Sequence, residues 1–160
     1  MEQNIHARFD AKHNEMRLAI MDFIIEHGRA YNPQNDGYSA LRITSTSQEF
    51  QSLVRTLIQK EGLVCNAQGD ITCAYPVSSM PTRHKVTLAD GRQLYTMCAI
   101  DALGSAFTFK QDVHIETLCG HSNTPIFIDV KDEQISDASS KDVHIITFHL
   151  DQIVNWSGSC

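Results

Sequence analysis

The chain has 160 residues, of which 42% are hydrophobic and 20% charged, and its formal net charge is -6. This composition is typical of one folded globular unit and excludes a disordered or collagen-like chain. The acidic balance argues against a domain that binds nucleic acid by neutralising phosphates, and no apolar run is long enough to span a membrane.

The first half of the chain is predicted to be mainly helical. Apolar residues recur at helical spacing, and the expected elements are helices over residues 10–27, 38–43 and 47–60, then a hairpin over 63–75. Gly28 and Gly62 provide helix stops, and Thr46 with Glu49 offers a capping box. This order of elements is that of a winged-helix unit, which we assign to residues 1–78.

The second half, residues 79–160, shows the alternation typical of strands. The expected elements are strands over 84–88 and 93–95 around an Asp90-Gly91 turn, a short helix over 97–103, strands over 113–117, 126–130 and 143–150, and a polar loop over 132–142. The predicted fold class is therefore α+β, with a winged-helix-like helical unit packed on a mainly antiparallel or mixed β-sheet.

Five cysteines carry the first chemical signal: Cys65, Cys73, Cys98, Cys119 and Cys160. An odd number in a chain without a secretion-type N-terminus favours free thiols or metal chemistry over a disulfide framework. The N-terminus, which has no secretion signal, also indicates a cytoplasmic protein. Cys65 and Cys73 lie on either side of the hairpin turn, and we expect both to be structural.

The most informative segment reads LYTMCAIDAL, over residues 94–103. If it turns helical after its first residues, Cys98 and Asp101 lie on the same helical face and bring a thiol and a carboxyl within reach of one ligand. A Cys-x-x-Asp pair on its own is more often a buried cysteine beside a helix-capping aspartate. The surrounding sequence decides between these interpretations.

The order Leu-Tyr-x-x-Cys-Ala-x-Asp-x-Leu resembles the active-site segment of organomercurial (alkylmercury) lyases. Downstream, residues 117–126 (TLCGHSNTPI) are similar to the strand, cysteine, polar loop and proline of that family. The resemblance is specific from about Pro76 to Val130. It implies an enzyme that cleaves carbon-mercury bonds by thiolate binding of mercury and protonolysis, giving a hydrocarbon and Hg(II). Mercury is a soft metal, so thiolates are its natural ligands.

The resemblance also implies roles for individual residues. Cys98 becomes a mercury-binding thiol, Asp101 the proton shuttle, and Cys160 the second mercury-binding thiol. No organic cofactor is required, and Hg(II) is the bound product. Organomercury compounds are the expected substrates, with small thiols or a mercuric reductase accepting the Hg(II). Members of the family continue beyond the position of Cys160, so the chain is expected to be a C-terminally short member.

Other interpretations of the thiols stay open. By resemblance Cys119 is structural, although Cys119 and His121, with one more donor, could hold a soft or borderline metal. The chain could also be a non-catalytic mercury- or copper-binding protein of the same fold, using Cys98 with Cys119 or Cys160.

A third hypothesis is a winged-helix DNA-binding metal sensor. Its predicted recognition helix, residues 47–60, carries only Arg55 and Lys60 as cations, against Glu49. This charge gives little attraction for phosphates, so nucleic acid is not an expected partner.

Overall fold

The computed structural model describes residues 9–43 and 45–146. Its helices are α1 (Ala11–His27), the short 3-10 helix η2 (Tyr38–Leu41), α2 (Ser47–Gln59) and α3 (Ala99–Phe109). None of these described helices is long and apolar enough to cross a membrane. The first three confirm the helical order predicted for the N-terminal part of the chain.

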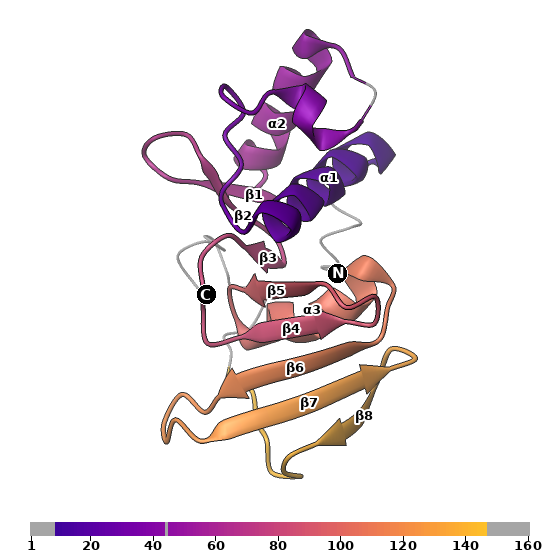
Figure 1. Cartoon of the computed structure of the whole chain (residues 1–160), viewed down its shortest axis with the longest axis vertical. Helices are drawn as coiled ribbons and strands as arrows, with labels where there is room; N and C mark the ends of the chain where they lie inside the picture. Colours follow the sequence, from indigo (N-terminus) through magenta and orange to yellow (C-terminus); the bar gives the residue numbers. More distant parts are fainter. Residues whose placement is uncertain (1–8, 44, 147–160) are drawn as a thin grey trace.

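The described strands are β1 (Leu63–Cys65), β2 (Ile71–Ala74), β3 (Val77–Ser78), β4 (Lys85–Leu88), β5 (Gln93–Thr96), β6 (Val113–Leu118), β7 (Pro125–Lys131) and β8 (Gln134–Ala138). They form one sheet in the order β1-β2-β3-β5-β4-β6-β7-β8, and every neighbouring pair is antiparallel. Figure 1 shows α1 and α2 beside the β1 end of this sheet and α3 against its middle. The predicted α+β class is confirmed.

The two long N-terminal helices begin at side-chain caps. The Asp10 carboxylate accepts a hydrogen bond from the His13 backbone amide at 3.0 Å, and Thr46 Oγ1 accepts one from the Glu49 amide at 3.2 Å. These caps satisfy amides that have no partner within the helix. Helix α1 ends at Gly28, whose φ of 62° is the left-handed conformation that glycine adopts without strain.

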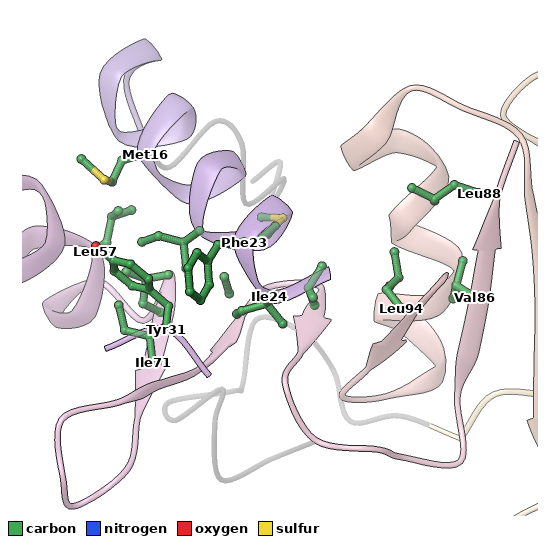
Figure 2. Close-up of a cluster of buried hydrophobic side chains, with 14 of the residues drawn as sticks. Met16, Phe23, Ile24, Tyr31, Leu57, Ile71, Val86, Leu88 and Leu94 are labelled. Carbon is green, nitrogen blue, oxygen red and sulfur yellow. The ribbon is translucent and has the colours of Figure 1, made fainter. Parts of the chain in front are cut away.

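One hydrophobic core runs through both parts of the molecule. Figure 2 shows its two ends: side chains of α1, α2 and β2 on one side, and those of β4 and β5 facing α3 on the other. Among the labelled residues, Tyr31, Leu57, Ile71 and Val86 are 0% exposed. The helical unit is therefore packed against the sheet.

Strand β3 joins the N-terminal hairpin to the rest of the sheet. Cys73 pairs with Ser78 and Ala74 with Val77, while on the other side Val77 pairs with Thr96 and Ser78 with Tyr95. The predicted boundary between residues 78 and 79 falls directly after this strand. Because one sheet crosses that boundary, the division into two units stays a prediction of the sequence.

Helix α3 differs from its predicted span of 97–103. It begins at Ala99, because Cys98 has extended backbone angles (φ -147°, ψ 176°), and it continues to Phe109. The longer helix follows from its buried positions Ala102, Ser105 and Ala106, which face the sheet. Lys110, with a φ of 52°, ends it.

Two predictions near the end of the described chain are wrong. The polar loop expected over 132–142 contains β8, because Asp132 and Glu133 adopt positive φ (49° and 61°) and turn the chain back along β7. The strand expected over 143–150 is absent from residues 143–146. The remainder of that predicted strand, 147–150, lies outside the described residues.

Candidate functional site

Cys98 occupies the N-cap of α3, two residues after the end of β5. Its side chain makes no capping hydrogen bond to the free amides of the first turn. The thiol instead donates to Asp101 Oδ2 at 3.4 Å. The predicted contact between the two residues is thus present, although Cys98 precedes the helix rather than lying within it.

Two threonines fix the backbone of this turn. Thr82 Oγ1 donates to the Thr96 carbonyl at 2.7 Å, and Thr96 Oγ1 donates to the Cys98 carbonyl at 3.2 Å. Thr96 is 0% exposed. The position of Cys98 is therefore set by hydrogen bonds from two neighbouring segments as well as by the start of α3.

The Asp101 carboxyl is held in its protonated form. Burial raises its pKa, as do the negative charge of a Cys98 thiolate and the thiol hydrogen bond. The Cys98 backbone amide acts in the opposite direction, and the resulting pKa is about 8. At neutral pH the site thus holds a carboxylic acid beside a thiol, which is a suitable pair for binding a soft metal and then delivering a proton.

Cys73 lies within electrostatic range of this pair and was not predicted as a site residue. It is 1% exposed on β2. Burial, followed by the charges of Asp101 and Cys98, raises the pKa of its thiol far above the ordinary range. Its place in the hairpin sequence gives no sign of this neighbourhood, which depends on the pairing of β2, β3 and β5.

Cys119 does not join the site. It lies in the turn between β6 and β7, which is closed by hydrogen bonds of 2.9 Å from the Cys119 amide to the Thr124 carbonyl and from the Asn123 amide to the Cys119 carbonyl. The side chain is partly exposed, so it differs from the core-packed cysteine that was expected.

Hydrogen bonds stabilise the thiolate of Cys119. The Ser122 hydroxyl, then the backbone amides of Ser122 and His121, lower its pKa to about 7. His121 thus acts on the thiol through its amide. In the described part of the chain, no group of three or more His, Cys, Asp or Glu side chains could hold a metal ion, so a Cys119–His121 site has no third donor there. Cys160 lies outside the described residues.

One model of a known protein family matches the second half of the chain. A family model described as "MerB: Alkylmercury lyase" matches residues 77–160, just over half of the sequence. The chain belongs to the alkylmercury lyase family. Both Cys98 and Asp101 lie inside the matched region.

Relatives of known name lead to the same family. Proteins named "Alkylmercury lyase" from Bacillus cereus and Clostridium butyricum are each 28% identical over 106 residues, covering 65% of this chain and 48% of the relative. The chain therefore spans about half the length of these curated alkylmercury lyases.

A solved structure supports the fold. "Crystal structure of the mercury-bound form of MerB2" is similar with a TM-score of 0.60 and 26% identity, covering 83% of this chain and 62% of that one. The α+β architecture described above is thus that of an alkylmercury lyase family member.

Proposed function

We propose that the chain is an organomercurial lyase, which cleaves carbon-mercury bonds by thiolate binding and protonolysis to give a hydrocarbon and Hg(II). The observation that carries this proposal is the Cys98 thiol 3.4 Å from Asp101, whose pKa burial raises to about 8. Membership of the family and the names of its relatives support it.

Mercury binding is the first step. The Cys98 thiol displaces the ligand X from R-Hg-X and its proton leaves with X as HX, while Asp101 keeps its own proton. The product is R-Hg-S-Cys98, and Asp101 is then a carboxylic acid. Burial favours this neutral form of Asp101, so the proton stays in the site until the next step.

Bond cleavage follows when a second thiolate binds the mercury, a role that we assign to Cys160. The carbon keeps the electron pair of the broken bond and takes the proton from Asp101. Asp101 then takes up the proton of the second thiol and returns to its protonated form. In total, R-Hg-X and two thiols give R-H, HX and a bis-thiolate complex of Hg(II). No organic cofactor takes part.

Release of the product needs competing thiols. Two thiolates hold Hg(II) strongly because both partners are soft. Small thiols in excess, or the thiols of a mercuric reductase, accept the ion by exchange. Organomercury compounds are therefore the proposed substrates, and a thiol donor is the proposed partner.

The direct test is methane release from methylmercury in excess cysteine, measured by headspace gas chromatography. We expect methane from the wild type and from Cys65→Ser, a matched cysteine variant outside the site, and none from Cys98→Ser. Loss in Cys160→Ser would identify the second thiol. A wild-type protein that retains mercury but releases no methane would overturn the proposal in favour of a non-catalytic soft-metal protein for mercury or copper.

A further inference from the structure

We propose that Thr96 is a positioning residue for Cys98 and Asp101: its hydroxyl holds the turn between β5 and α3 in the shape that directs the Cys98 thiol at the acid. The family pattern Leu-Tyr-x-x-Cys leaves position 96 open, so the resemblance assigns this residue no role. The expected effect on cleavage rests on the proposed function, whereas the positioning itself can be tested without cleavage.

The connection between β5 and α3 is very short. Only Met97 and Cys98 separate Thr96, the last residue of β5, from Ala99, the first residue of α3. Neither of the two belongs to a helix or a strand. The Thr96 side chain spans this connection, because its Oγ1 donates a hydrogen bond to the Cys98 carbonyl at 3.2 Å.

The Cys98 carbonyl accepts two hydrogen bonds. One comes from the Ala102 amide at 3.0 Å, which is the first helical bond of α3, and the other comes from the Thr96 hydroxyl at 3.2 Å. The first bond ties the carbonyl to α3 and the second ties it to β5. The Cys98 peptide therefore cannot rotate without losing one of them, which keeps Cys98 in its extended conformation (φ -147°, ψ 176°).

Thr96 is itself held firmly by the sheet. It is 0% exposed, and it pairs with Val77 of β3. Its amide donates to the His84 carbonyl at 3.0 Å, and its carbonyl accepts from Thr82 Oγ1 at 2.7 Å. A buried hydroxyl without an acceptor is costly, so the bond to the Cys98 carbonyl is favoured. Thr96 thus links Cys98 to a fixed part of the molecule.

The direction of the Cys98 side chain matters for the reaction. An N-cap side chain usually turns toward the free amides of its helix, but Cys98 makes no such bond and its thiol donates to Asp101 Oδ2 at 3.4 Å. In the proposed reaction the acid must reach a carbon on the mercury that Cys98 binds. A misplacement of about 1 Å can lower a rate by roughly 100-fold, so a loosened turn should slow cleavage.

Thr96→Val removes the hydroxyl but keeps the side-chain shape and suits a strand. We expect kcat for methane release from methylmercury to fall by about tenfold or more, while KM changes by less than about twofold because the Cys98 thiol remains. Thr96→Ser keeps the hydroxyl and should restore kcat. A wild-type kcat in Thr96→Val, or an equal loss in Thr96→Ser, would overturn the proposal.

The matched control for these variants is Thr72→Val. Thr72 is also a partly buried strand threonine, and its Oγ1 donates to the Val64 carbonyl at 3.3 Å in the hairpin. Its loss should leave kcat at the wild-type value. Circular dichroism of each variant checks that the protein is folded.

Alkylation of Cys98 by iodoacetamide, followed by mass spectrometry, tests the positioning without cleavage. Asp101→Asn should change this rate in the wild type, because it alters the group that accepts the thiol hydrogen bond. The same change should have a smaller effect in the Thr96→Val background and its full effect with Thr96→Ser, since neighbouring changes that act on one contact are not additive. An equal effect in all backgrounds would overturn the proposal. A smaller effect in Thr96→Val, with no methane from the wild type, would overturn the proposed function alone.

Discussion

Helices α2 and α3 begin with the same arrangement, an N-cap residue followed three positions later by an acid, yet the two starts have opposite chemistry. At α2, Thr46 caps the Glu49 amide at 3.2 Å, and an ion pair with Lys12 lowers the pKa of Glu49. At α3, Cys98 makes no side-chain cap, and the pKa of Asp101 rises to about 8.

The difference shows what turns a structural motif into a reactive one. The Glu49 carboxyl has a cation and solvent beside it, whereas Asp101 has burial and a thiol. In both helices the acid also accepts a hydrogen bond from the backbone amide of the N-cap residue. The start of α3 thus keeps one half of a capping box, the hydrogen bond from the N-cap amide to the acid, while the Cys98 thiol donates to Asp101 at the positive end of the helix dipole.

Removing the acid at each helix start should give the largest contrast. Asp101→Asn keeps the shape of the side chain but has no proton to deliver, so methane release should fall by roughly 100-fold or more. Glu49→Gln, the matched change at α2, should leave the rate unchanged. Initial rates from methylmercury measure both, and equal rates in Asp101→Asn and wild type would contradict the proton-shuttle role.

The pH dependence of cleavage should give the next largest contrast between Asp101 and Glu49. Asp101 is protonated below its pKa of about 8 and ionised above it, so cleavage should fall by about tenfold for each pH unit above that value. Glu49, whose pKa is lowered, stays ionised throughout this range. Methane rates measured with a stable substrate and constant thiol test this, and a rate that rises through the Asp101 pKa would contradict it.

Stability should respond in opposite directions at the two N-caps. Serine in Cys98→Ser can cap the free amides of α3 and should stabilise the fold by up to about 1 kcal/mol while abolishing cleavage. Thr46→Ala removes a cap and should destabilise by about 1 kcal/mol. Urea unfolding measures the two free energies, and a less stable Cys98→Ser would mean that the thiol already satisfies this helix start.

The smallest effect concerns Cys119, which has a low pKa without any helix start. If hydrogen-bond donors and solvent set the direction of a pKa shift, Cys119 should alkylate faster near pH 7 than the buried Cys73 and the partly buried Cys65, whose pKa values are raised. Ser122→Ala should slow Cys119 a few-fold, and Ser52→Ala should not. Mass spectrometry that resolves each cysteine measures the alkylation rates, and faster labelling of Cys65 than of Cys119 would contradict the prediction.

Periodicity predicted those elements whose side chains alternate between core and surface. Helices α1 and α2 and the central strands β4 to β7 have buried apolar positions at regular spacing, so the sequence carries their pattern. Strand β8 has mostly exposed residues, including Ile135 at 60%, and so has no core-facing alternation to detect. Strand β3 has two residues, too few for any period.

The candidate site was predictable where its contacts are local. Cys98 and Asp101 are three positions apart at a helix start, so their spacing predicts the observed contact. The influence of Asp101 and Cys98 on the Cys73 thiol, and the raised pKa of Asp101, both depend on the folded chain. These properties arise only in the tertiary structure, where no short motif records them.

The two-residue strand β3 has a mechanical consequence. It is the narrow joint of the sheet, with the hairpin of β1 and β2 on one side and the remaining strands on the other. Two residue pairs on each side of β3, together with the hydrophobic core, therefore join the two parts, and a substitution that weakens β3 would let them separate.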